Sequence, residues 1–198
     1  MESRDLSGLH FPPVGSEIDF QVRKASPIDA SAVAHVYVAS WRSTYGALLP
    51  AAILRGMSEV RETLFWWTAL CAQRTKSVTL VIQDRENRIV GFIAAGPERA
   101  ASTGSRAEVY TLYLLEEYQR RGLGTRLIAA AAEALHAGGF ASLVVWVLAG
   151  NPARAFYERL GAERVAARTI RMGGQPVHEI AFAWPDLAFA RAAPAKRS

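Results

Sequence analysis

Apolar residues recur at two different spacings along this chain, and the succession of the two predicts a mixed α/β fold. Helical spacing marks three long segments, at 26–40, 58–72 and 122–137. Alternating or continuous apolar runs predict strands at 19–23, 77–83, 88–95, 108–115 and 142–147. A short helix that ends at Gly161 follows, and then a hairpin that turns at 172–175. We therefore expect one strand, two helices, three strands, then helix, strand, helix and hairpin in a single domain.

The same spacing predicts which side of each helix faces the core. The predicted inward residues of the first helix are Ile28, Ala32, Val33, Val36 and Tyr37. Those of the second helix are Val60, Leu64, Trp67 and Cys71, and the pair Trp66-Trp67 is also expected in the core. Those of the third helix are Leu127, Ile128, Ala131 and Leu135. The segment 41–50 between the first two helices is predicted to be a loop.

The ends of the chain lack this periodicity. Residues 1–17 contain Pro12-Pro13 and are predicted to form a flexible lead-in, the domain spans 18–185, and 186–198 form a flexible tail. No apolar run reaches the length of a membrane span, so we expect no membrane partner. Cys71 is the only cysteine, which excludes an internal disulfide and favours a cytoplasmic location. No histidines occur at metal-ligand spacing, and we expect no metal.

The formal net charge of +5 is compatible with a polyanionic ligand or with nothing specific. Arginines are scattered among glutamates and do not form a stripe interleaved with aromatic residues, so a nucleic-acid partner is not expected. One local exception is the segment Gln119-Arg120-Arg121-Gly122-Leu123-Gly124, between a predicted strand and a helix. Glycines and positive charge at a helix N-terminus favour binding of a phosphate through backbone N–H groups.

Two common nucleotide-binding motifs do not fit this segment. A phosphate-binding loop of the Walker A type requires a lysine after its second glycine, and none stands there. A dinucleotide fingerprint requires a third Gly or Ala where this chain has Leu127, and no acidic residue follows at the ribose-reading position.

The segment with its flanks resembles the acetyl-CoA-binding motif of the GCN5-related N-acetyltransferase (GNAT) superfamily, Gln/Arg-x-x-Gly-x-Gly/Ala. The preceding residues 110–114 are similar to the central strand of the family, and the following segment Asn151 to Gly161 is similar to its next motif. The resemblance covers roughly residues 18–185. It implies an α/β fold with a mixed, mostly antiparallel sheet, a splayed strand pair and flanking helices.

The resemblance also implies where acetyl-CoA lies. Backbone N–H groups of the segment Arg121–Thr125, which includes Gly122, Leu123 and Gly124, would bind the pyrophosphate. Gln119 belongs to the motif, and Arg120 or Arg121 could add a charge-assisted bond or could simply be solvated. Leu112, Tyr113 and Leu114 would lie along the pantetheine arm, which pairs with exposed main chain.

Three further residues are candidates for the chemistry. The family places a general acid where this chain has Tyr157, although an aromatic packing role beside Phe156 is the alternative. We expect Phe156 and Leu160 to point inward and Tyr157 to face the cleft. Glu108 could be a general base through a water, or a solvent-facing or ion-paired glutamate. Asn151 could cap a helix, contact water or pantetheine, or do both. A ribosomal-protein-acetylating branch carries a glutamate where this chain has Trp146, so the base of that branch is absent.

These residues predict an N-acetyltransferase that moves an acetyl group from acetyl-CoA to a primary amine of a small molecule or peptide, by direct attack in a ternary complex. The alternative is an acyl-CoA-binding sensor without turnover. The acceptor would be shaped by the segment 41–50 and the hairpin at 173–174, which carry few acids. A homodimer is the commonest oligomer for such a protein.

Overall fold

Seven strands form one continuous sheet in this computed structural model, which describes residues 19–46, 48–49, 51–72, 76–99 and 106–187. The spatial order is β1-β2-β3-β4-β5-β7-β6, and every neighbouring pair is antiparallel except β4 and β5. The strands are β1 (Phe20–Lys24), β2 (Val78–Asp84), β3 (Ile89–Pro97), β4 (Arg106–Leu114), β5 (Ser142–Leu148), β6 (Glu163–Met172) and β7 (Gln175–Trp184). The predicted mixed, mostly antiparallel α/β fold is confirmed.

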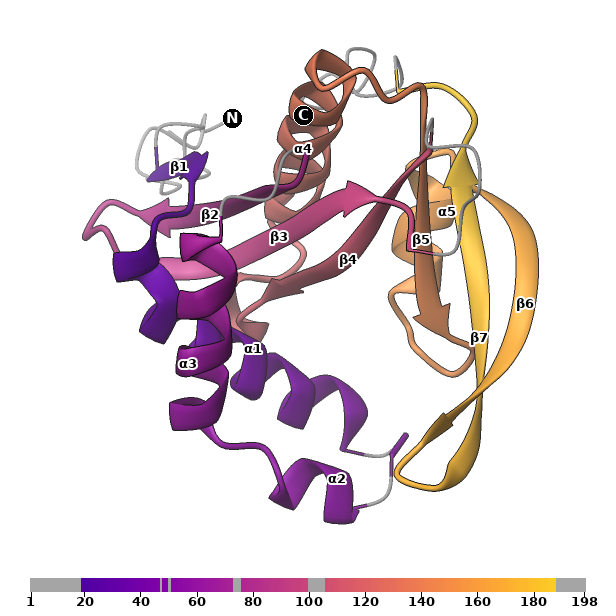
Figure 1. The fold of residues 1–198 in the computed structure, drawn as a ribbon, viewed down its shortest axis with the longest axis horizontal. Coiled ribbons are helices and arrows are strands. Elements are labelled where there is room, and N and C mark those ends of the chain that lie inside the picture. The colour runs from indigo at the N-terminus through magenta and orange to yellow at the C-terminus, as the bar shows by residue number, and fades with distance from the viewer. Residues whose placement is uncertain (1–18, 47, 50, 73–75, 100–105, 188–198) are drawn as a thin grey trace, which may run out of the picture.

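Helices cover both sides of the first half of this sheet (Figure 1). They are η2 (Pro27–Asp29), α1 (Ala30–Tyr45), α2 (Ala51–Arg55), α3 (Glu59–Cys71), η3 (Glu116–Tyr118), α4 (Leu123–Ala137) and α5 (Arg154–Arg159). Helix α4 packs on β1 to β4, whereas α1 packs on β3 and β4 and carries α3 on its outer side. Strand β3 is consequently buried on both faces, which explains its continuous run of apolar and small residues.

The parallel pair β4 and β5 separates part-way along its length (Figure 1). Only Arg106 to Val109 of β4 pair with Ser142 to Val145 of β5, although β4 continues to Leu114 and β5 to Leu148. The β3–β4 ladder is irregular where the separation begins. Ala95 of β3 pairs with Val109 of β4, but the next residue, Ala94, pairs with Thr111, so one residue of β4 is skipped. The predicted splayed strand pair is therefore present.

The first helical segment differs from its prediction at both ends. Helix α1 runs to Tyr45, so residues 41–45 are helical and not a loop, while 47 and 50 lie outside the described residues. Ile28 is exposed, although Val33 and Val36 are buried as predicted. Ile28 lies in the 3₁₀ turn η2, where the angular spacing of side chains differs from that of the α-helix that follows.

The predicted inward face of α3 was wrong. Val60, Leu64, Trp67 and Cys71 are all exposed, and the buried residue is Trp66. The Trp66 ring packs edge-to-face on Phe92 of β3, with ring centroids 5.0 Å apart. Apolar residues occur on both sides of this helix, so their spacing alone could not choose the inward side. For α4 the prediction is confirmed, since all four of its predicted inward residues are buried.

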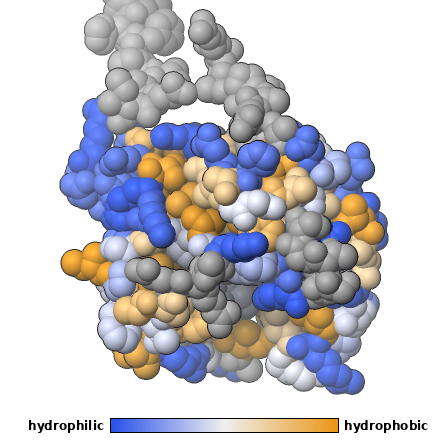
Figure 2. Space-filling view, turned by 45° about the horizontal axis from the view of Figure 1, so that its top comes forward, coloured by the Kyte–Doolittle hydropathy of each residue, from blue (hydrophilic) through white to orange (hydrophobic). Residues whose placement is uncertain are grey.

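The domain boundaries can be compared only in part, because 1–18 and 188–198 lie outside the described residues. At the C-terminal side, Leu187 is buried and its N–H donates to the carbonyl of Ala141. None of the helices in the described part of the chain is long and apolar enough to cross a membrane. On the face that Figure 2 shows, hydrophilic and hydrophobic residues are interspersed.

A partly buried ion pair fixes the start of α1 against β1. Arg23 of β1 donates two hydrogen bonds to the two carboxylate oxygens of Asp29, at 2.7 and 2.8 Å. The backbone N–H of Ser26 adds a third, at 2.8 Å. The hydrogen bond from Arg23 is the main reason that the pKa of Asp29 falls from 3.8 to about 2, since burial acts in the opposite direction.

We predict that Asp29→Asn lowers the free energy of unfolding by about 2 kcal/mol at pH 7. The reason is that the pKa of Asp29 is about two units lower in the folded protein than its ordinary value. The folded-state pKa is the lower one, so this contribution is complete above pH 3.8 and is lost as the pH falls towards 2. Urea unfolding at pH 7 and pH 3 measures the difference. Glu86→Gln, at an exposed turn residue, is the control and should change stability little at either pH. A difference that does not shrink at low pH would refute the ion-pair explanation.

Candidate functional site

The start of α4 presents a row of unsatisfied backbone donors. Helix α4 begins at Leu123, and the first N–H to be bonded within it is that of Arg126, to the carbonyl of Gly122. In the described part of the chain, the N–H groups of residues 120–125 donate to no acceptor. Arg120 and Gly122 both have positive φ, of 60° and 77°, which turns the chain sharply into the helix. Unpaired N–H groups at the positive end of a helix make this turn a potential anion site.

The two glycines of the motif serve different purposes. Gly122 needs its left-handed φ, and a Cβ there would meet nothing within 4 Å. A Cβ on Gly124 would lie 3.2 Å from the ring of Phe156, so glycine lets the first turn of α4 approach α5. Gln119 ties the loop to β4, because its side-chain amide donates to the carbonyl of Leu114 at 3.2 Å.

The arginines of the motif are exposed beside this row of donors. The Arg121 guanidinium lies 5.3 Å from the centroid of the Tyr118 ring, which orients it. Arg120 forms no ion pair with any of the described residues. Leu123 is buried in the core and Thr125 is half-buried, so at these positions the backbone and not the side chain faces a ligand.

The separated strands leave main-chain groups on facing edges. Leu112, Tyr113 and Leu114 are paired with β3 on one edge only, and all three are half-buried. The Tyr113 ring packs edge-to-face on Tyr37 of α1, with ring centroids 5.4 Å apart, and also packs on the apolar cluster of Tyr45, Leu49 and Leu148. The hydroxyl of Thr111 is buried and has no hydrogen-bond partner among the described residues. The three predicted cofactor residues therefore border the gap mainly through their backbone.

Asn151 does more than cap a helix. Its side-chain carbonyl accepts from the N–H of Ala153 at 2.8 Å, which orders the turn before α5, and its amide donates to the hydroxyl of Tyr45 at 3.2 Å. Burial raises the pKa of Tyr45, while hydrogen bonds with Tyr113 and Asn151 act in the opposite direction. Tyr45 was missed in the sequence because its partner is 106 residues away.

Tyr157 is buried and its ring packs between aromatic residues of α5 and β7. Its centroid is 6.4 Å from that of Phe182 and 6.1 Å from that of Trp184. Phe156 and Leu160 are half-buried and pack against the core as expected, but Tyr157 is buried more deeply than either. Among the described residues the Tyr157 hydroxyl has no hydrogen-bond partner, and burial raises its pKa well above 10. The phenol therefore carries its proton at neutral pH.

Glu108 is 2% exposed and is held by Arg99. The backbone N–H of Arg99 donates to one carboxylate oxygen at 3.0 Å, and its guanidinium donates to the other through Nε, also at 3.0 Å, and through Nη2. A carboxylate offers about four acceptor positions, so about one remains. Glu108 is thus an ion-paired residue with about one acceptor position left for a water or a ligand.

A second ion pair lies on the neighbouring strands, and no local pattern in the sequence indicates it. Arg168 of β6 donates to Glu179 of β7 at 2.8 Å, and its guanidinium lies 3.9 Å from the centroid of the Trp146 ring. Glu179 lies opposite Leu148 of β5 in the strand register. Burial is the main reason that the pKa of Tyr45 is raised, and the hydrogen bond with Glu108 is the main reason for Arg99; the Glu179 charge adds a small part to both. Only the strand register brings these residues together.

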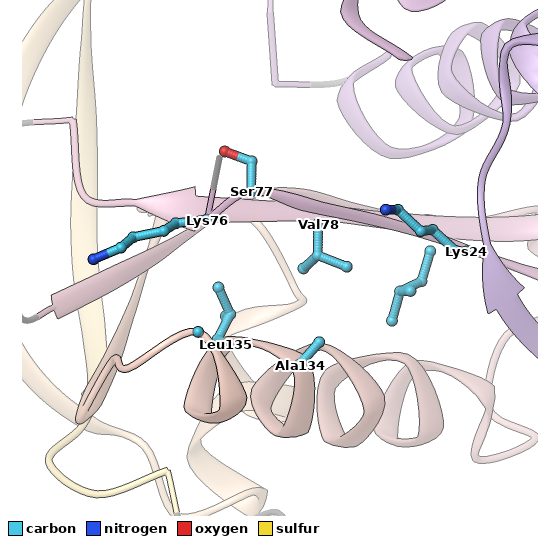
Figure 3. Close-up of a pocket in the computed structure, with 8 residues that line it drawn as sticks. Lys24, Lys76, Ser77, Val78, Ala134 and Leu135 are labelled. Carbon is cyan, nitrogen blue, oxygen red and sulfur yellow. The ribbon is translucent and has the colours of Figure 1, made fainter. Parts of the chain in front are cut away.

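One cavity of about 370 Å³ lies elsewhere, between β2 and the C-terminal end of α4. Figure 3 shows its apolar floor, with Val78 above Leu135 and Ala134, while the Lys76 amine points away from it. It contains none of the predicted site residues. The described residues include no group of three or more His, Cys, Asp or Glu that could hold a metal ion.

Comparison with known proteins agrees with this geometry. Residues 37–162 match the model of the acetyltransferase (GNAT) family. A Bacillus subtilis (strain 168) protein named as the uncharacterized N-acetyltransferase YuaI is 37% identical over 166 residues, which cover 84% of this chain and 93% of that protein. The structure of the PaiA N-acetyltransferase from Thermoplasma acidophilum, solved with coenzyme A, matches with a TM-score of 0.62 at 19% identity. The match covers 81% of this chain and 97% of the PaiA chain. The structure of the yncA acetyltransferase of Salmonella typhimurium, solved with its cofactor acetyl-CoA, matches with a TM-score of 0.65 at 16% identity. This match covers 84% of this chain and 94% of the yncA chain. The structural matches show the fold, and the family model and the Bacillus relative show that this chain belongs to the GNAT family of acetyltransferases.

Proposed function

We propose that this protein transfers an acetyl group from acetyl-CoA to a primary amine, by direct attack within a ternary complex. The observation that carries the proposal is the row of free N–H donors at 120–125, which opens beside the gap between β4 and β5. One feature suits a pyrophosphate and the other suits an extended arm that can pair with main chain. Acetyl-CoA has both a pyrophosphate and an extended arm, so one molecule of it could occupy the two adjacent features.

The residues present fit this cofactor. The backbone of the turn, from Arg121 through Gly122, Leu123 and Gly124 to Thr125, would bind the pyrophosphate. Arg120 and Arg121 add positive charge there, and Gln119 fixes the loop that carries them. The free edge of β4 at 112–114 would pair with the pantetheine arm, and Asn151 borders the opposite side of the gap.

The transfer itself needs few groups. The acceptor nitrogen attacks the thioester carbon, the carbon–sulfur bond breaks, and the departing thiolate takes a proton. Tyr157 suits that donor role because burial keeps its phenol protonated. A main-chain N–H of β4 near Leu114 would stabilise the developing oxyanion. Since Cys71 is on α3, no cysteine suits a covalent intermediate, which supports direct attack.

Removal of the amine proton is less well supported by a single residue. The Glu108 carboxylate is occupied by Arg99, so it could act only through a water at its one remaining acceptor position. We keep Glu108 as the candidate for this relay, with Arg99 as the group that positions it. The acceptor would enter beside Tyr45 and the Arg168–Glu179 pair.

We predict that Gly122→Ala weakens coenzyme A binding about tenfold, which corresponds to about 1.4 kcal/mol. An alanine at φ 77° is strained by about 1–2 kcal/mol, and relief of this strain would turn the adjacent N–H groups away from the ligand. Isothermal titration with coenzyme A measures the effect.

The matched control is Gly139→Ala at the other end of α4. Gly139 also has a positive φ, of 87°, and no atom within 4 Å of an added Cβ, so it should lose similar stability. Its affinity for coenzyme A should stay close to the native value. Equal affinities of both variants would contradict the assignment of the turn.

We also predict that Tyr157→Phe lowers kcat by about 100-fold, the lower part of the range for a general acid. The hydroxyl has no partner to lose among the described residues, so stability and coenzyme A affinity should change little. Because the pKa is raised, wild-type kcat should show no loss from this group up to about pH 10, the ordinary pKa of a phenol. Free-thiol release with the best amine from a screen of amino acids, small amines and peptides measures it.

Tyr37→Phe is the control, since it removes the hydroxyl of a half-buried tyrosine, whose pKa burial raises to about 12. This variant should keep its kcat. Unchanged turnover in Tyr157→Phe would refute the acid assignment. Coenzyme A binding without turnover of any amine would favour the sensor function instead.

A further inference from the structure

The exposed apolar residues of this protein are concentrated on one helix. Seven large hydrophobic side chains are exposed in the described part of the chain, and five of them lie on η2 and α3. On α3, Val60, Leu64 and Trp67 are 82%, 64% and 51% exposed. Cys71 continues the same line and is also exposed. We call these four residues, Val60, Leu64, Trp67 and Cys71, the α3 stripe.

Packing among the residues that the structure describes does not use the α3 stripe. Helix α3 already buries its opposite side, where Trp66 contacts Phe92 of the sheet and Tyr37 of α1. The stripe therefore adds a second apolar face, to a helix that needs only one to hold its place. Apolar patches of this kind on a folded surface mark contacts with another molecule.

The spacing of the α3 stripe is the same in both directions. Its members are separated by four, three and four residues, which is the a/d spacing of a coiled-coil seam. A two-fold axis through the middle of the stripe would place Val60 opposite Cys71 of a second copy, and Leu64 opposite its Trp67. Self-complementarity of this kind is what a symmetric interface requires.

The charges around the stripe agree with a second copy more than with other partners. Glu59 is paired with His35 at 3.3 Å, and the guanidinium of Arg61 binds the carbonyl of Gly56. Neither charge is directed to an external partner. The outer face has no row of Lys or Arg to attract an anionic membrane or an acidic peptide.

We propose that two copies of this protein associate by antiparallel packing of α3 on α3 through the stripe. The stripe exposes roughly 400 Å² per copy, and Ile28 of η2, which packs on α3, brings the exposed apolar surface to roughly 550 Å². Two copies would thus bury roughly 1,100 Å², which is close to the lower limit of a stable interface. This inference does not depend on the proposed function.

Sedimentation velocity at micromolar concentration tests the interface. The native protein should sediment as a dimer and Leu64→Glu as a monomer, because the substitution buries two charges against apolar side chains. Val165→Glu is the matched control, since Val165 is 52% exposed on β6, away from α3, and should leave the dimer intact. A native monomer, or a dimer that survives Leu64→Glu, would overturn the proposal.

A disulfide tests the orientation. Cys71 is the only cysteine, so Val60→Cys gives the chain a second one. Within one helix these positions are about 16 Å apart, too far for an internal bond. In the antiparallel pair, the thiol introduced at position 60 faces Cys71 of the second copy, so mild oxidation should give a covalent dimer on a non-reducing gel.

The native protein and Val165→Cys should stay uncrosslinked, because the two native Cys71 residues would lie at opposite ends of the paired helices. Crosslinking of the native protein through Cys71 alone would overturn the antiparallel arrangement. So would a Val60→Cys variant that sediments as a dimer and does not crosslink.

Discussion

The separation of β4 from β5 is the constraint on which the rest of the site depends. The two strands share only the pairs from Arg106–Ser142 to Val109–Val145, and beyond these each has a partner on one side only. A free strand edge in the middle of a sheet leaves backbone donors and acceptors without partners, which is costly unless a ligand or water satisfies them. The gap is therefore an arrangement that water or a bound ligand stabilises, and its width must be held by contacts outside the ladder.

Helix α1 supplies those contacts, because it bonds to both sides of the gap. Ser40 donates to the carbonyl of Leu114 at the end of β4, at 3.1 Å. Further along the same helix, Tyr45 accepts from Asn151 just after β5, at 3.2 Å. A single helix that bridges both strands fixes their distance, whereas separate loops would let it vary. This also explains why α1 must continue to Tyr45, through the segment that was predicted from the sequence as a loop. The row of donors at the start of α4 then lies at the open end of a gap whose walls are already fixed.

The features that could be predicted from the sequence are those that depend on residues close together in the chain. The turn at 119–124 and the inward face of α4 depend on residues within a few positions of one another, and local spacing carries that information. The Asn151–Tyr45 bond spans 106 residues, and the Arg99–Glu108 pair depends on strand register, so neither leaves a local pattern. Orientation failed where apolar residues occupy more than one side of a helix. In α3 and α5 the most deeply buried side chain is the aromatic residue that packs on other aromatic rings. Trp66 of α3 packs on Phe92, and Tyr157 of α5 packs beside Phe182 and Trp184.

The misassigned face of α3 is informative for the same reason. A helix with two apolar faces is expected when it packs on two different partners, and among the described residues α3 has a packing partner for one face. On the inner side, a line of ring contacts connects α3 to β4. The Trp66 ring contacts Tyr37 with centroids 6.2 Å apart, and Tyr37 contacts Tyr113 of β4 with centroids 5.4 Å apart. The outer residues of the α3 stripe take no part in this line of rings. The proposed association through α3 and the proposed chemistry at β4 would thus depend on different sides of one helix. A substitution on the outer side would then abolish the association without removing a contact that serves the chemistry.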